Sequence, residues 1–93
     1  MANEVRASHI LVSSEQEAKD LKARIEQGED FGQIAQQHSQ CPSGQSGGDL
    51  GFFGKGMMVP EFETAAFNAS PNQCSEPVKT QFGYHLIKVT EQR

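Results

Sequence analysis

Hydrophobic and polar residues alternate at both ends of the chain, which predicts a β-strand at each end. The first alternating stretch covers residues 4–12 and the last one residues 82–89. Every second side chain of a strand points to the same face of its sheet. Each predicted strand therefore presents one histidine among apolar neighbours. The residues that share these faces are Val5, Ala7, His9 and Leu11 in the first strand, and His85, Ile87 and Val89 in the last.

Apolar residues recur at helical spacing in three segments between these strands. Ser14 is followed three positions later by Glu17, a capping-box pattern that predicts the start of a helix, and Gly28 is a natural end for it. Asp30 can cap a second, shorter helix. Pro60 can open a third helix, because its missing N–H does no harm in the first turn.

Glycines gather between residues 39 and 56, where six of the nine lie. We expect a structured loop there around a short strand at residues 50–53. Another short strand is predicted at residues 75–78, and residues 80–83 turn into the last strand. The element order is β-α-α-β-α-β-β, which indicates an α+β fold in a single domain over residues 1–93.

Composition and charge narrow the possible functions. The net charge is −4 and Lys and Arg form no run, so there is no electrostatic basis for binding nucleic acid. No apolar stretch approaches about 18 residues, and the N-terminus has no signal-peptide pattern, so we expect a cytoplasmic protein away from membranes. Cys41 and Cys74 fit no metal-binding spacing and are expected to be free thiols. We therefore predict no metal and no cofactor.

His9 and His85 are the first candidates for chemistry. A buried histidine is costly unless its ring nitrogens find hydrogen-bond partners. If the two end strands pair, each histidine is the nearest partner for the other. From residue types alone, two core histidines that merely tie the strands together are as good an interpretation as a functional pair.

Several large apolar residues lie at the ends of predicted elements, beside glycine-rich turns. They are Leu50, Met58, Phe62 and Phe82. Taken alone, such residues more often belong to the core; the alternative is a shallow apolar pocket at the rim of the sheet, suited to a small aliphatic ring. Cys41, in a chain that also has histidines, raises the possibility of nucleophilic catalysis. Its other interpretation is a small buried hydrophobic residue.

Five ordered blocks of the sequence resemble the parvulin family of peptidyl-prolyl cis/trans isomerases. The blocks are residues 9–12, 48–53, 56–67, 75–78 and 82–88. They follow one another in unbroken order over essentially the whole chain, so the resemblance is far more specific than any single motif. Residues 41–44 resemble the corresponding loop of the small, stand-alone cytoplasmic parvulins of bacteria and archaea.

The resemblance implies a four-stranded antiparallel sheet surrounded by helices, with the two end strands side by side at its centre. It implies a proline-ring pocket formed by Leu50, Met58 and Phe62 and bordered by Phe82. The implied activity is isomerisation of X-Pro bonds in peptides and unfolded proteins, by a monomer that assists folding. The residues implied to form a polar floor under the isomerising bond are His9, Cys41, Thr80 and His85.

The loop after the first strand departs from the pattern of phosphate-directed parvulins, which carry a basic cluster there. In this chain residues 13–17 include Glu15 and Glu17 and no Lys or Arg, and the absence of tryptophan excludes a WW-type targeting module. Phosphate recognition needs clustered basic side chains. We therefore expect substrates without phosphate, with uncharged, apolar residues preferred before proline.

Two other functions stay open at this point. A peptide-binding chaperone could use the same groove without turnover, although binding alone does not need a polar floor. A Cys-His hydrolase would need a base close to Cys41 and an oxyanion hole. Because isomerisation makes and breaks no covalent bond, we expect a non-covalent mechanism in which Cys41 contributes polarity and is not a nucleophile.

Overall fold

The two ends of the chain pair at the centre of an antiparallel sheet. The computed structural model describes residues 3–93, and in them β1 (Glu4–Val12) lies beside β4 (Gly83–Gln92). The sheet has the order β2-β1-β4-β3, with β2 (Asp49–Gly54) and β3 (Val78–Thr80) at its edges. All neighbouring strands are antiparallel. This arrangement confirms the expected fold class and the central position of the end strands.

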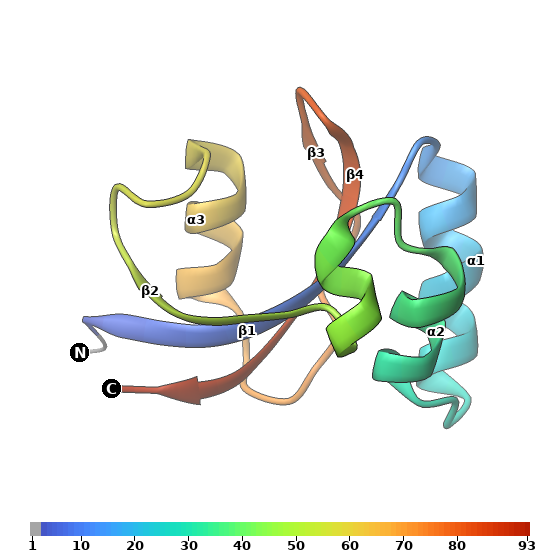
Figure 1. Ribbon diagram of the computed structural model, residues 1–93, viewed down its shortest axis with the longest axis horizontal. Helices are drawn as coiled ribbons and strands as arrows, with labels where there is room; N and C mark the ends of the chain where they lie inside the picture. The colour runs from blue at the N-terminus through green and yellow to red at the C-terminus, as the bar shows by residue number, and fades with distance from the viewer. Residues whose placement is uncertain (1–2) are drawn as a thin grey trace.

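Helices cover both faces of the sheet. α1 (Glu15–Glu26) and α2 (Phe31–His38) follow β1, and α3 (Pro60–Asn68) follows β2. The central strands run between α3 on one side and α1 and α2 on the other (Figure 1). A short 3₁₀ helix, η1 (Pro42–Ser46), lies in the glycine-rich loop before β2. None of the helices in residues 3–93 is long and apolar enough to cross a membrane.

The predicted helix starts are confirmed. Ser14 Oγ accepts a hydrogen bond of 3.1 Å from the backbone N–H of Glu17 at the start of α1. The Asp30 carboxylate accepts one of 2.9 Å from the N–H of Gln33 at the start of α2. Pro60 is the first residue of α3. Local capping signals therefore fixed the positions of all three helices.

The strand predicted at residues 75–78 is wrong in its limits, because β3 begins only at Val78 and extends to Thr80. Pro77 has no backbone N–H to donate to a ladder. Ser75 Oγ accepts from the N–H of Ile87 (2.9 Å), which replaces a ladder bond with a side-chain bond. The segment therefore follows β4 without forming a regular strand. One consequence is that Thr80, expected in the turn, belongs to an edge strand.

The alternating side chains of β1 and β4 contribute to two separate cores, one on each face of the sheet. One core lies under α1 and α2 and the other under α3. The buried residues of the first are Ile10, Val12, Ala18, Leu21, Phe31, Ile34, Ala35 and Leu86. Those of the second are Val5, Ala7, Phe53, Phe62, Ala66, Ile87 and Val89. His9 and His85 lie on the α3 face, at the end where this second core opens to solvent.

Candidate functional site

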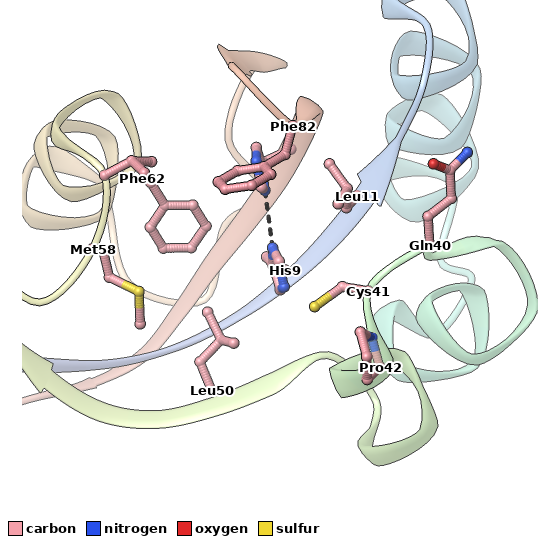
Figure 2. A pocket seen from close by; sticks show the side chains of 11 residues that line it. His9, Leu11, Gln40, Cys41, Pro42, Leu50, Met58, Phe62 and Phe82 are labelled. Atoms are coloured by element: carbon pink, nitrogen blue, oxygen red, sulfur yellow. Dashed lines mark hydrogen bonds between the residues drawn. The ribbon is translucent and has the colours of Figure 1, made fainter.

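A cleft of about 410 Å³ opens beside the second core and brings together seven of the eight predicted site residues. Its floor is the α3 face of β1 and β4, and its walls come from α3, β2, η1 and the turn between β3 and β4 (Figure 2). Thr80 is the predicted residue that does not line it. The lining residues are His9, Leu11, Gln40, Cys41, Pro42, Leu50, Met58, Val59, Phe62, Phe82 and His85.

One end of the cleft is an apolar socket formed by Leu50, Met58 and Phe62. Phe62 projects from α3 and is only 3% exposed. Its ring meets the rings of His9 and His85 edge-on, with centroids 5.5 and 5.3 Å apart. The three apolar residues predicted to act together therefore lie together, directly beside the histidines (Figure 2).

His9 and His85 contact each other directly. In the β1–β4 register His9 lies opposite Ile87 and His85 opposite Leu11, so the histidines are diagonal neighbours. Their Nδ1 atoms are 3.0 Å apart, and their nearly parallel rings have centroids 5.2 Å apart. Both side chains are buried, with 5% and 4% of the residue surface exposed. The predicted pairing is confirmed.

Ser43, which the sequence did not single out, connects the histidine pair to Cys41. His9 Nε2 lies 3.1 Å from Ser43 Oγ, and the Ser43 hydroxyl donates to Cys41 Sγ at 3.3 Å. Gly48 allows the loop that carries Cys41 and Ser43 to approach the backbone of β1 at His9. Its φ of 85° is left-handed, and a Cβ there would collide with the backbone of His9, whose N–H donates to Gly48 O at 2.9 Å. This backbone hydrogen bond holds the loop that carries Cys41 against β1.

Thr80 supports the floor from behind His85. Its Oγ1 lies 2.8 Å from His85 Nε2 and accepts a hydrogen bond of 3.2 Å from the backbone N–H of Phe82. Because that N–H can only donate, the Thr80 hydroxyl is free to donate to His85 Nε2. In that arrangement His85 carries its proton on Nδ1 and donates to His9 Nδ1; the direction of both bonds depends on the tautomer.

With these tautomers the hydrogen bonds run in one direction across the floor. With Nδ1 as the acceptor, His9 carries its proton on Nε2 and donates to Ser43, whose hydroxyl donates to Cys41. In the reverse order, the hydroxyl proton of Thr80 would need an acceptor other than His85. Within residues 3–93, no buried side-chain nitrogen or oxygen lacks a hydrogen-bond partner. The floor is therefore a fully connected, ordered polar network inside an apolar surround.

Burial keeps both imidazoles neutral near pH 7. Desolvation, together with the neighbouring His85, lowers the pKa of His9 from 6.5 to about 4. Burial also lowers the pKa of His85. Two neutral rings sharing one proton between their Nδ1 atoms fit this electrostatic setting, whereas two imidazolium ions would repel each other.

The opposite end of the cleft contains residues that the sequence analysis did not assign. Leu11, Gln40 and Pro42 line it. The signals for them were weak: Leu11 lies two residues after His9 on the same face of β1, and Gln40 and Pro42 merely flank Cys41. Phe82, 60% exposed, stands at the mouth of the cleft, as expected for a residue bordering it.

The described part of the chain has no group of three or more His, Cys, Asp or Glu side chains placed to hold a metal ion. Cys41 and Cys74 are both free thiols. The groups that the cleft offers to a ligand are therefore an apolar socket, a neutral hydrogen-bonded floor and a thiol at its edge.

Comparison with known proteins identifies the family of the chain. The model of the PPIC-type PPIASE domain matches residues 1–93. The foldase protein PrsA of Geobacillus kaustophilus is 54% identical over 88 residues, which cover 94% of this chain and 31% of that protein. The chain thus spans about a third of the length of the curated relatives it matches.

Solved structures agree with the family model. The peptidylprolyl isomerase PrsA of Bacillus anthracis superposes with a TM-score of 0.96 at 48% identity, over 99% of this chain and 43% of that one. NmPin, a parvulin of Nitrosopumilus maritimus, gives a TM-score of 0.89 at 43% identity and is matched over nearly its whole length, 98% of this chain and 99% of that one. The resemblance to parvulins inferred from the sequence is confirmed.

Proposed function

Because the chain belongs to the PPIC-type peptidyl-prolyl cis/trans isomerase domain family, we propose that it rotates X-Pro bonds of protein substrates by a non-covalent mechanism. The observation that carries this proposal is an apolar, ring-sized socket directly beside a buried, neutral, hydrogen-bonded floor. The relatives named foldases support a role in assisting protein folding.

The reaction sets a specific physical task. Amide resonance gives rotation about a peptide bond a barrier of about 18–20 kcal/mol. In the twisted transition state this resonance is lost, the carbonyl is less polar and the prolyl nitrogen is pyramidal and basic. Catalysis requires only that the site bind this twisted state better than either planar state. Because no covalent bond is made or broken, the reaction needs no acid, base or cofactor.

The cleft can favour the twisted state in three ways. Leu50, Met58 and Phe62 would hold the proline ring fixed while the preceding carbonyl rotates. The partly enclosed cleft would take that carbonyl away from some of the water that stabilises the planar amide. The ordered dipoles of His9 and His85 would complement the altered charge without reorganising during the rotation.

The position of Cys41 supports a polar role for its side chain. Its Sγ accepts a hydrogen bond from Ser43, which in turn connects to His9. In the described structure neither cleft imidazole hydrogen-bonds the thiol directly, whereas a Cys-His hydrolase would use such a contact to generate a thiolate. We propose that Ser43, His9, His85 and Thr80 act through this network as positioning residues for the carbonyl site.

We propose further that substrates need no phosphate. The loop between β1 and α1 presents Ser13 and Ser14, both exposed, followed by exposed Glu15. A dianionic phosphate there would meet a carboxylate where recognition requires clustered Arg or Lys. The overall charge of −4 adds to this repulsion.

We propose that residues 1–93 act as a single isomerase domain on proline-containing peptides and unfolded proteins. We propose further that the protein is monomeric and cytoplasmic and binds neither nucleic acid nor membranes. The scattered basic residues and the free thiols Cys41 and Cys74 support this assignment. Analytical ultracentrifugation and cell fractionation of the native protein would test the oligomeric state and the location.

A protease-coupled isomerase assay tests the central proposal. Phe62→Leu keeps an apolar side chain in the core but removes the ring that faces the histidines, and it should lower kcat/KM about tenfold or more. Phe67→Leu is the matched control, because Phe67 lies on the same helix and packs on Phe53 outside the cleft. Activity of Phe62→Leu within twofold of the parent would refute the socket assignment.

The same assay tests substrate choice when peptides carry Ala, Leu, Glu or phosphoserine before proline. We expect Leu-Pro to be turned over faster than Glu-Pro or phosphoSer-Pro. A phosphoSer-Pro peptide isomerised tenfold faster than Leu-Pro would contradict the assignment of the loop after β1.

A further inference from the structure

β2 departs from a regular strand at the point where it forms one wall of the apolar socket. Between Arg6 and Ser8 the chain advances two residues along β1, but the paired segment of β2, residues 49–52, advances three. β2 therefore carries one extra residue there, which is a β-bulge. Gly51, inside the bulge, has a left-handed φ of 71°, a conformation that glycine adopts without steric cost.

The bulge decides which face of the sheet Leu50 occupies. Side chains of a regular strand alternate between the two faces, so Leu50 would share the face of Phe52, which lies opposite Arg6 and away from α3. The extra residue reverses this alternation. Leu50 lines the cleft, on the same face as Phe53 of the second core, and Figure 2 shows its side chain directed from β2 toward His9. Without the bulge, the socket would lose this wall.

A carboxylate on the face away from α3 holds the bulge in place. Asp49 Oδ1 accepts a hydrogen bond of 3.0 Å from the backbone N–H of Gly51. A bulge interrupts the backbone ladder, and here a side chain supplies the acceptor. The same carboxylate accepts two bonds from the guanidinium of Arg6, from Nε to Oδ1 at 3.2 Å and from Nη2 to Oδ2 at 2.7 Å. The hydrogen bonds from Arg6 and Gly51 lower the pKa of Asp49, so the carboxylate is ionised at neutral pH.

Arg6 joins the bulge to the strand that carries the floor of the cleft. It lies in β1, three residues before His9, and on the opposite face of the sheet. Arg6 and Asp49 are partly exposed and lie outside the core under α1 and α2. The planar guanidinium fixes the direction of a carboxylate through two parallel bonds, which a single ammonium charge cannot do. The pair thereby sets the position of Leu50 relative to His9, although neither member lines the cleft.

We propose that Asp49 and Arg6 are positioning residues for the apolar socket: from the opposite face of the sheet, they hold β2 in the bulged conformation that directs Leu50 at the proline ring. This inference rests on the proposed function and adds to it two residues that act without contacting the substrate. Because the socket holds the ring in the planar and the twisted state alike, loss of the pair should weaken substrate binding and leave the rotation step nearly unchanged.

The KM for a Leu-Pro peptide tests the pair. Asp49→Ala removes the acceptor for both Gly51 and Arg6. KM should rise about fourfold, the effect of about one methylene group of lost burial, while kcat changes by less than about twofold. Asp49→Asn keeps an oxygen that can accept from the N–H of Gly51 and should restore KM to within about twofold of the parent. Equal increases of KM in the two variants would contradict the bond to Gly51 as the positioning contact. KM does not depend on the amount of folded enzyme, so partial unfolding cannot produce the expected result.

Glu29→Ala is the matched control, because Glu29 forms a comparably exposed pair of bonds with Arg24, at 2.9 and 2.8 Å, outside the cleft. It should leave KM unchanged. Two glycines provide a second comparison. Gly51 and Gly28 both have a left-handed φ, and a Cβ on either would meet no atom within 4 Å. Gly51→Ala should raise KM as Asp49→Ala does, whereas Gly28→Ala should lower stability and leave KM unchanged.

The methyl resonances of Leu50 give a second measurement that needs no activity. In NMR spectra of isotope-labelled protein they should shift in Asp49→Ala and stay in place in Glu29→Ala. If both KM and these resonances are the same in Asp49→Ala as in the parent, the positioning role is refuted while the isomerase function stands. If the parent isomerises no peptide, the proposed function fails. The Leu50 resonances, together with the dissociation constant of the Leu-Pro peptide from NMR titration, then still decide the role of the pair.

Discussion

Alternate residues of β1 and β4 form the two faces of the central strands, and the two faces differ in structure: one is a closed core and the other carries the cleft. On the face covered by α1 and α2, Ile10 and Leu86 are completely buried in a purely apolar core. On the face covered by α3, the preceding residues in sequence, His9 and His85, form a hydrogen-bonded pair at the edge of a cleft. One residue along each strand thus separates a sealed core from an open site.

The difference shows how a small domain can accommodate an ordered polar site. The sealed face supplies stability that does not depend on the site, because its side chains never touch the cleft. On the open face the polar side chains hydrogen-bond one another, and no buried side-chain nitrogen or oxygen in residues 3–93 lacks a partner. Substitutions on the sealed face should therefore change stability, and those on the open face should change catalysis as well.

The largest effect is expected on the sealed face. Leu86→Ala should lower the free energy of unfolding by about 2–5 kcal/mol, because it removes a fully buried side chain and leaves a cavity. Urea unfolding followed by circular dichroism measures this loss. The kcat/KM per folded molecule should not change, since Leu86 does not line the cleft. A loss of activity beyond the loss of folded protein would break the separation of the two faces.

Acid should destabilise the protein through the open face. The folded-state pKa of His9 is about 4 and the unfolded one about 6.5, so the unfolded chain binds more protons between these values. Stability is therefore complete above pH 6.5 and is lost as pH falls towards 4, by about 1.4 kcal/mol per unit, or about 3 kcal/mol in all. The lowered pKa of His85 acts in the same direction.

Urea unfolding at a series of pH values measures this dependence. The His9→Gln/His85→Gln variant should have a flatter stability curve between pH 6.5 and 5.5, where carboxylates contribute little. Above pH 7 its curve should run parallel to that of the parent. Equal slopes in the acidic range would mean that the histidines are not held neutral by the fold.

Much of the fold was predictable because its signals are local. Ser14, Asp30 and Pro60 mark helix starts by the chemistry of capping, which needs no tertiary contact. The strand around Ser75 failed because its pairing is decided by β4: the Ser75 hydroxyl and the lack of an N–H on Pro77 replace a regular ladder, and neither effect is visible in hydrophobic alternation.

The site was predictable where it lies on regular strands and where family resemblance supplied the rest. Strand alternation alone placed His9 and His85 on matching faces, and the pairing of end strands brought them together. Ser43 was missed because its role depends on the close approach of Gly48 to His9, a contact across the fold. Thr80, predicted in the floor, contacts His85 Nε2 from behind and does not line the cleft.

Breaking the histidine pair should have the next largest effect. His9→Ala or His85→Ala leaves the other ring with an unpaired nitrogen in a buried position, which costs about 1–3 kcal/mol of stability. The double variant should lose at least about 1 kcal/mol less than the sum of the single losses, since the bond between the two rings is broken by the first change and cannot be lost a second time. Thermal unfolding of the four proteins measures the coupling. Gln37→Ala combined with His9→Ala is the control and should be additive; strict additivity of the histidine pair would contradict direct pairing.

The smallest effect is expected at the edge of the open face. Cys41→Ser should retain turnover, with kcat/KM reduced less than tenfold, because a serine hydroxyl can accept the hydrogen bond from Ser43 as the thiol does. A non-covalent rotation needs that acceptor and the polarity of the floor, and it does not need a nucleophile. Cys74→Ser is the matched control, since Cys74 is half-buried outside the cleft, and should leave kcat/KM unchanged. Complete inactivity of Cys41→Ser in a folded protein, together with an acyl adduct trapped on Cys41 of the parent and detected by mass spectrometry, would replace the polar role with covalent catalysis.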